Sequence, residues 1–374
     1  MRKIQPFSYM RWAKAHYYDA PISLVPSGMP PPGPEEFRIP GDLDLRTELL
    51  AVGKDSLQGQ ICSIYKAEEE ECLVTAGSTQ ADLLAFHLFL EPGDEVLIES
   101  PAYGLFQSLA STVGAKARSF KRLPENDFDL IPSDIEAALS PKTKLVVFTT
   151  VHNPSARVAS PEILEDLGER LEKRGIPGLA SEVYLDFSPD SPAAGGRRPF
   201  AHRCHPALLS ANSMTKVYGL GSVRTGWLLG RPEWIRAAAD LREIYAPVLP
   251  AVPLRISALA LQQRKGLLAR ARQLSENGRA RFLEALARMP GFSAPRPQAG
   301  LTALVQVQDD AGAPLDTMAF SDWLRTEKGL GVVPGDFFGL PGSLRVGYGV
   351  PPETLDKGLA LLDEGRRQFA SITG

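Results

Sequence analysis

The chain has 374 residues, of which 44% are hydrophobic, enough to fill the core of two domains or of one large domain with a smaller satellite. Its 41 Lys and Arg residues against 44 Asp and Glu residues give a net charge of -3, without a basic stripe of the kind that neutralises a phosphate backbone. Nucleic acid is therefore not an expected partner.

Cysteine usage and hydropathy indicate the cellular setting. Cys62, Cys72 and Cys204 are odd in number and scattered, which argues against a disulfide framework and indicates a reducing compartment. The segment 202–205 reads His-Arg-Cys-His, but adjacent ligands are too crowded to close one tetrahedral site, so no metal is expected. The N-terminus lacks the apolar segment of a secretion signal, and no uncharged apolar run approaches the roughly 18 to 20 residues of a membrane span. We expect a cytoplasmic protein that does not bind membranes.

The first predicted elements belong to a large α/β domain. The proline-rich arm 26–34 cannot form a regular helix. Beyond it, short apolar runs alternate with segments of helical periodicity, of which 161–171 is one, behind a Ser160-Pro161 start signal. The predicted strands cover 72–75, 95–99, 144–149, 207–210 and 227–229. This alternation is typical of a mostly parallel sheet with helices on both faces.

The last third of the chain predicts a smaller α+β domain. A long helical pattern over 255–288 leads out of the large domain, and strands are expected over 304–307 and 344–347, followed by a helix from Pro352. The resulting division is an N-terminal arm with part of the small domain at 1–40, a large domain at 41–265 and the small domain at 266–374.

Two polar motifs indicate a phosphate site. A glycine, Gly77, opens the helix that follows the first strand, and a helix N-terminus with free N–H groups suits a phosphate, although most helices begin in this way. Later, Ser213 and Arg224 flank Lys216, so that a hydroxyl and a guanidinium could hold a phosphate while the lysine forms a Schiff base with an aldehyde cofactor. A lysine three residues after a serine is by itself more typical of a polar surface turn.

Further motifs occur in order along most of the chain. They are Ser100-Pro101-Ala102-Tyr103, Asn153-Pro154-Ser155-Ala156, Ser181-Glu182-Val183-Tyr184, Pro334-Gly335-Asp336-Phe337-Phe338 and Ser343-Leu344-Arg345-Val346-Gly347. Together with the lysine segment, this ordered set resembles the class I/II aminotransferases, which are pyridoxal-phosphate enzymes of fold type I. The resemblance implies a homodimer that exchanges an amino group between amino-acid and keto-acid substrates.

The resemblance also implies a role for each matching residue. The phosphate of pyridoxal phosphate would lie against Gly77, Ser78, Thr79, Ser213 and Arg224. Tyr103 would stack on the pyridine ring, and Asn153 and Tyr184 would contact its hydroxyl. Lys216 would form the Schiff base and then act as the base that moves the substrate's proton. Gly28 would lie at the mouth of the substrate site, and Arg345 would clamp the substrate α-carboxylate.

One position departs from the family. Ser181 stands where these enzymes carry the aspartate that pairs with the pyridine nitrogen, and a neutral hydroxyl does not keep that nitrogen protonated. The next residue, Glu182, should point to the opposite face if the segment is extended. Either another acid comes from elsewhere in the fold, or the chemistry is altered.

A second departure concerns the partner subunit. The family uses a partner tyrosine ahead of a G-x-x-x-L-R signature, which fits residues 41–46, but the nearest upstream aromatic here is Phe37, which lacks a hydroxyl. Whether a partner residue completes the phosphate site is left open by the sequence.

The motifs favour transamination and leave other readings open. Elimination or replacement, or another amino-acid transformation on the same scaffold, would suit the loss of the aspartate at position 181. A catalytically silent cofactor-binding protein is a further alternative. A nicotinamide dehydrogenase fits poorly, because Arg224 stands where the third glycine of G-x-G-x-x-G should follow Gly219 and Gly221.

Overall fold

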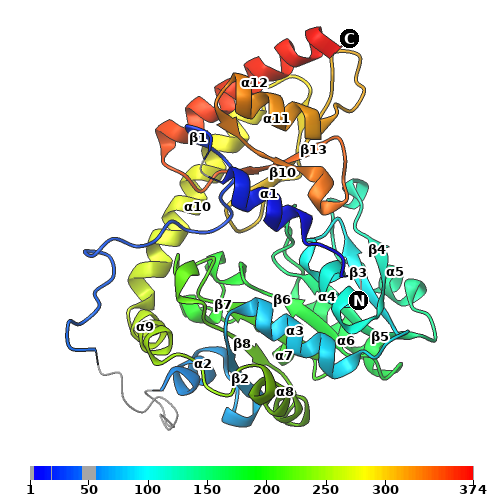
Figure 1. Ribbon diagram of the computed structural model, residues 1–374, viewed down its shortest axis with the longest axis vertical. Helices are drawn as coiled ribbons and strands as arrows, with labels where there is room; N and C mark the ends of the chain where they lie inside the picture. Colours follow the sequence, from blue (N-terminus) through cyan, green and yellow to red (C-terminus); the bar gives the residue numbers. More distant parts are fainter. Residues whose placement is uncertain (1–3, 18, 44–55, 374) are drawn as a thin grey trace.

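The computed structural model describes residues 4–17, 19–43 and 56–373. At its centre lies a seven-stranded sheet with the order β2-β8-β7-β6-β5-β3-β4 (Figure 1). In this order the strands span Cys72–Thr75, Gly226–Leu229, Leu208–Ser213, Gly178–Ser181, Thr143–Thr149, Glu95–Ser100 and Lys116–Lys121. The strands from β7 to β4 are parallel, and β8 is antiparallel to both β2 and β7. The predicted mostly parallel sheet is confirmed, and the strand expected over 207–210 continues to Ser213.

Helices bury both faces of this sheet, which explains why its strands read as continuous apolar runs. On one face, α3, α4 and α8 pack on side chains such as Leu179 of β6 and Ala211 of β7. On the other, α5 and α6 pack on β5 around Phe148, and α2 packs on Trp227 of β8. The helices of this part are α2 Leu57–Tyr65, α3 Ser78–Phe89, α4 Leu105–Val113, α5 Pro132–Ala138, α6 Pro161–Glu172, α7 Ala201–Cys204 and α8 Pro232–Tyr245. As predicted, α6 begins at Pro161, where Ser160 accepts a hydrogen bond from Ile163 N at 3.3 Å.

A second, smaller sheet lies in the C-terminal part of the chain. Its four antiparallel strands have the order β12-β13-β10-β9 and carry α11 and α12. These elements are β9 Phe292–Ser293, β10 Thr302–Val307, α11 Thr317–Glu327, β12 Val333–Pro334, β13 Ser343–Gly347 and α12 Pro352–Thr373. Near the N-terminus, β1 (Ile22–Ser23) pairs in parallel with β11 (Leu330–Gly331), so the two ends of the chain share this part of the fold.

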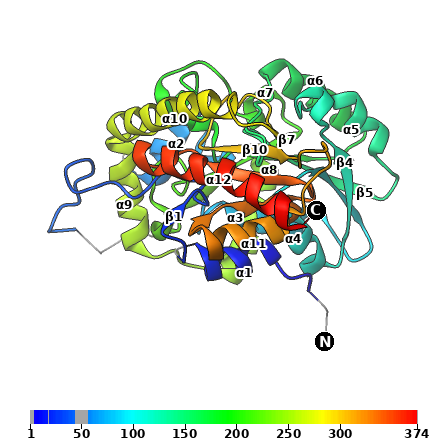
Figure 2. The same cartoon turned by 90° about the horizontal axis from the view of Figure 1, so that it is seen from above.

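The long helical pattern before the small sheet forms two helices. These are α9 (Ala251–Gln262) and α10 (Arg264–Leu286), which meet at Gln263. Seen from above, α10 and α12 run side by side (Figure 2). The domain boundary expected after residue 265 falls in the first turn of α10 and stays a prediction. Among the described residues, no helix is both long enough and apolar enough to cross a membrane.

The N-terminal chain runs from α1 (Ser8–His16) along the molecule to α10 (Figure 1). Residues 24–43 form neither helix nor strand, as the proline-rich sequence predicts. This arm is held by Arg270 of α10, which donates to Pro30 O at 3.0 Å and pairs with Glu36 at 2.7 Å. The arm is thereby fixed where it passes Lys216.

The contact between α3 and the sheet is a first test of this architecture. Leu84 of α3 is 0% exposed, so Leu84→Ala should lower the free energy of unfolding by about 2–5 kcal/mol, because it leaves a cavity between helix and sheet. Leu123, which is 44% exposed, is the matched control, and Leu123→Ala should stay within about 0.5 kcal/mol of the wild type. Urea unfolding followed by circular dichroism measures both, and equal effects would contradict this packing.

Candidate active site

The residues predicted to bind the cofactor follow strands at one edge of the central sheet, whereas Arg345 comes from β13 of the small sheet and Gly28 from the N-terminal arm. The register places Ser181, the last residue of β6, beside Thr149 of β5 and Ala211 of β7. Because β8 is antiparallel, it starts at this same edge, where Gly226 pairs with both Thr75 and Ser213. The carboxyl ends of the parallel strands and the start of β8 thus bring the separate motifs together.

The expected phosphate turn depends on two glycines. Gly77 has φ +84° ahead of α3, and a Cβ there would lie 2.7 Å from Nη2 of Arg224. A Cβ on Gly226 would lie 2.6 Å from Ser78 N. The absence of both side chains lets the arginine and the strand approach the first turn of α3, which forms a cradle for an anion.

The remaining residues assigned to the phosphate surround this turn. Ser213 is buried at the end of β7, and its hydroxyl accepts a hydrogen bond from Thr215 N at 3.3 Å. Ser78 is half-buried, whereas Thr79 and Arg224 are exposed in the single chain. A hydroxyl, a guanidinium and a helix N-terminus therefore converge at one place, which fits a phosphate dianion.

Lys216 lies where the N-terminal arm meets the large sheet. Its Nζ donates to Ser27 Oγ at 2.9 Å and lies 5.6 Å from the ring centroid of Tyr184. Met29 N donates to Lys216 O at 2.8 Å, and a Cβ on Gly28 would lie 3.3 Å from Lys216 Cα, so glycine permits this close approach. These residues border a cavity of about 550 Å³, with α1 on its other side through residues such as Tyr9.

Two buried polar groups, of which Tyr184 lies beside Lys216, suit the ring hydroxyl of pyridoxal phosphate. In the described part of the chain, Asn153 Oδ1 and the Tyr184 hydroxyl are buried and meet no partner at hydrogen-bonding geometry. Burial raises the pKa of Tyr184, but the positive charges of Lys216 and Arg345 outweigh burial, and the net effect is a lowered pKa. A phenolic oxygen placed here would satisfy both groups, because an amide can present either its oxygen or its nitrogen.

Arg345 forms a buried receptor for an anion. It is 1% exposed between the rings of Tyr9 and Phe338, whose centroids lie 5.2 and 5.1 Å from Cζ. Nη2 donates to the Tyr9 hydroxyl at 2.8 Å and to Val25 O at 3.2 Å. Nε and Nη1 have no hydrogen-bond partner among the described residues. A buried guanidinium that keeps free donors is a site for a small anion such as a carboxylate.

Tyr103 lies between the arginine receptor and the lysine. Its ring meets Phe7 at 5.1 Å and Tyr9 at 5.8 Å between centroids, both edge-on, and it borders the same cavity as Lys216. Burial raises the pKa of its hydroxyl well above the usual range, so the ring stays neutral. This position is consistent with a ring that stacks on a planar cofactor.

Ser181 brings no charge to the site, and its neighbour does not replace it. Glu182 points to the opposite face of the sheet, as predicted, where its carboxyl accepts from Ala201 N of α7 at 3.2 Å. Burial raises the pKa of Glu182 to about 8. The expected alternation of neighbouring side chains along an extended strand is thus confirmed.

The segment that the family places at the partner subunit is described only in part. Asp44, Leu45 and Arg46 of the G-x-x-x-L-R signature lie outside the described residues. Phe37 is buried in the core of its own chain together with Met29.

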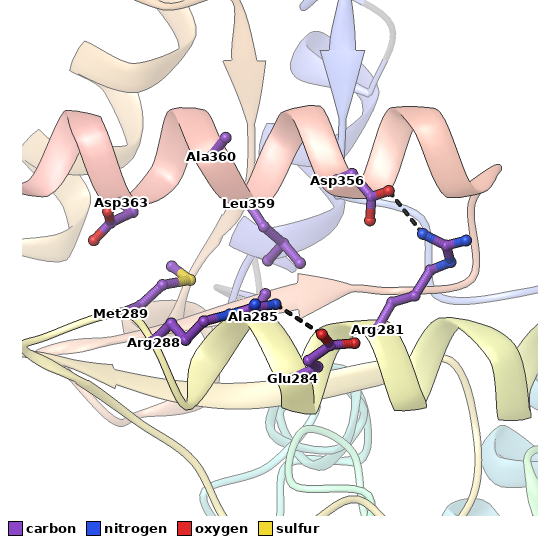
Figure 3. A pocket seen from close by; sticks show the side chains of 9 residues that line it. All are labelled: Arg281, Glu284, Ala285, Arg288, Met289, Asp356, Leu359, Ala360 and Asp363. Carbon is purple, nitrogen blue, oxygen red and sulfur yellow. Dashed lines mark hydrogen bonds and ion pairs between the residues drawn. The ribbon is translucent and has the colours of Figure 1, made fainter.

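A second cavity, of about 390 Å³, lies between α10 and α12 (Figure 3). Its charged side chains all have ion-pair partners: Arg281 contacts Asp356 at 2.8 Å, Arg288 contacts Glu284 at 3.0 Å, and Asp363 pairs with Arg367 outside the cavity. It contains none of the predicted site residues, and its charges are already compensated. The cavity at Lys216 is the better candidate for chemistry.

Sequence reasoning missed two residues at this cavity. Tyr9 contacts Arg345 and Ser27 contacts Lys216, and these pairs are 336 and 189 residues apart in the chain. Neither residue stands in a motif with a chemical signature of its own. The nearest local signal was Gly28, which was expected at the mouth of the substrate site and directly follows Ser27.

Comparisons with known proteins agree with this geometry. The family described as aminotransferase class I and II matches residues 45–362. A capreomycidine synthase from Streptomyces vinaceus is 27% identical, over 94% of this chain and 92% of its own length. An aspartate/prephenate aminotransferase from Thermus thermophilus is 29% identical, over 82% of this chain and 76% of its own. A crystal structure of a PLP-dependent aminotransferase from Streptococcus suis is 25% identical, with a TM-score of 0.88 over 98% of this chain and 99% of its own.

The glycine cradle yields a direct test. Gly77→Ala should raise the dissociation constant for pyridoxal phosphate at least about tenfold, because the new methyl group displaces Arg224 from a charge-assisted contact. Gly93→Ala is the matched control: Gly93 also has a left-handed φ, +100°, but its Cβ would meet no described atom within 4 Å. Both affinities are measured by absorption titration, and equal losses would mean that backbone strain alone causes the effect.

Proposed function

The chain belongs to the class I and II aminotransferase family, and on this premise we propose that it transfers the α-amino group of an amino acid to a keto acid, with pyridoxal phosphate bound through Lys216. The observation that carries this proposal is the buried Arg345, whose two unpaired nitrogens offer a carboxylate site next to the cavity that Lys216 borders. An amino acid has both groups that these residues would recognise.

The residues at the sheet edge have distinct roles in this proposal. When bound, pyridoxal phosphate supplies an aldehyde that condenses with amines and a ring that withdraws electrons from the substrate's α-carbon. The turn at Gly77, Ser78 and Thr79 would hold its phosphate together with Ser213 and Arg224. Tyr103 would cover one face of the ring, and Asn153 and Tyr184 would bind the ring hydroxyl.

Lys216 would also move the proton on which the reaction depends. Its Nζ would take the proton from the substrate α-carbon and later return one, as a general base and acid. The contact with Ser27 Oγ at 2.9 Å keeps Nζ in the cavity. The ring centroid of Tyr184 lies 5.6 Å from Nζ, and the positive charges of Lys216 and Arg345 lower the pKa of its hydroxyl against the effect of burial.

A second candidate function follows from Ser181. With a neutral hydroxyl at that position, an elimination, a replacement or another amino-acid transformation on the same scaffold would be favoured over amino-group transfer. The similarity to a protein named capreomycidine synthase over nearly the whole chain agrees with this alternative. Transamination remains the main proposal, because Lys216 and Arg345 match its requirements directly.

We also propose a homodimer in the cytoplasm. Four exposed apolar side chains gather within residues 244–252, at the end of α8 and the start of α9, and such a patch suits a subunit interface. These side chains are Ile244, Tyr245, Val248 and Val252.

The proposed cytoplasmic location is supported by the cysteines. The structure has free thiols at Cys62, Cys72 and Cys204, which suits a reducing compartment.

The proposed function is tested by adding each amino acid to the cofactor-loaded protein without a keto acid. Transamination predicts a loss of visible absorption from the bound cofactor and the release of one equivalent of the matching keto acid. Lys216→Ala should slow this step at least about 100-fold, because it removes the proton-transferring amine. Release of ammonia or of a cleaved side chain would instead establish the second candidate function.

The carboxylate site is tested separately at Arg345. Arg345→Lys should raise KM for the amino acid at least about tenfold, because lysine cannot make the planar two-point contact. Arg366→Lys is the matched control, since Arg366 is also buried but pairs with Asp310 in the small sheet region, away from the cavity. Steady-state kinetics should show an unchanged KM for the control, and the same increase in both variants would contradict the assignment.

A further inference from the structure

Asp82 of α3 is a buried acid without a partner. Four carboxyls are buried among the described residues, and three of them have partners: Glu99 pairs with Arg122 at 2.7 Å, Asp186 accepts from Tyr65 at 2.7 Å, and Glu182 accepts from the backbone of α7. Asp82 is 2% exposed, and within residues 4–17, 19–43 and 56–373 no donor reaches its Oδ1.

Such a group is costly to bury. An unpaired carboxyl in an apolar environment loses its hydration without compensation, and burial accordingly raises the pKa of Asp82 to about 8. A hydrophobic residue at this position would avoid that cost. The packing of α3 therefore does not by itself explain why a carboxyl occupies this buried position.

The position of Asp82 relates it to the cofactor cradle. It lies four residues after Ser78, so one helical turn separates it from the expected phosphate turn on the same side of α3. Its neighbours Ala81 and Leu84 pack on Leu179 of β6. Since side chains two residues apart on a strand share a face, Ser181 points to the α3 side as Leu179 does.

The carboxyl is also close enough to Tyr103 to affect it. Once ionised, the Asp82 carboxyl would add to the raised pKa of Tyr103, after the larger effects of burial and of the neighbouring Tyr9 and Tyr184. Asp82 therefore lies one helical turn beyond the phosphate turn, on the face of the sheet where Ser181 leaves the pyridine nitrogen without an acid. Glu182 lies on the other face and cannot serve.

We propose that the Asp82 carboxyl, reaching the site from α3, is the acidic partner of the pyridine nitrogen in place of an acid at position 181. The proton balance is simple: the proton of the buried neutral carboxyl moves to the ring nitrogen, and the carboxylate and the protonated ring form an ion pair. No external acid is required. This inference rests on the proposed function, because it presupposes bound pyridoxal phosphate.

Nitrogen NMR of the protein loaded with isotope-labelled pyridoxal phosphate tests the inference, because the shift of the ring nitrogen reports its protonation. The wild type should show a protonated nitrogen, and Asp82→Asn an unprotonated one with a dissociation constant raised roughly 10- to 100-fold, as expected for the loss of a hydrogen bond to a charged group. Adding Ser181→Asp to Asp82→Asn should restore the protonated signal. A merely structural role of Asp82 would not produce this rescue.

Asp186→Asn is the matched control, because Asp186 is equally buried but bonded to Tyr65, and it should leave the nitrogen signal unchanged. Asp82→Leu provides a second variant if the asparagine folds poorly, since it removes the charge without leaving an unpaired polar group. The same nitrogen signal in the wild type and both Asp82 variants would overturn the inference while leaving the proposed function intact. A wild type that binds no pyridoxal phosphate would overturn the proposed function as well.

Discussion

The site depends on the close approach of three backbone segments at the start of β8. Because β8 runs antiparallel between β2 and β7, Gly226 lies beside both Thr75 and Ser213. Its missing side chain leaves room for the first turn of α3, and Gly77 leaves room for Arg224. This packing arrangement positions every group that is assigned to the phosphate. The same helix, α3, carries Asp82 one turn further along.

The N-terminal chain completes the cavity from the other side. Tyr9 of α1 orients Arg345 through its hydroxyl, and Ser27 of the arm contacts Lys216, while β1 joins this chain to the small sheet. The carboxylate receptor and the lysine are therefore linked through a single extended segment. A displacement of that segment would disturb both groups together.

The electrostatics of the site follow from burial and from the pairing of charges. Tyr184 lies near the positive charges of Lys216 and Arg345, which lower its pKa against the effect of burial. Among the buried carboxyls, Glu99 pairs with Arg122, and Asp186 accepts a hydrogen bond from Tyr65 through one of its oxygens. Asp82 is the exception among the buried carboxyls of the described chain, and a positively charged ring nitrogen would remove that exception.

The sequence alone indicated the alternating strands and helices, the resemblance to the family and the residues that follow each strand, because a buried parallel strand and the polar turn after it leave local patterns in the chain. It also indicated that Glu182 turns away from Ser181, since strand alternation is local geometry. The contacts of Tyr9 with Arg345 and of Ser27 with Lys216, and the burial of an acid of α3 on the face of Ser181, became visible only in the folded molecule. Such contacts join positions far apart in the chain, and no pattern within either segment records how helices and strands pack against each other.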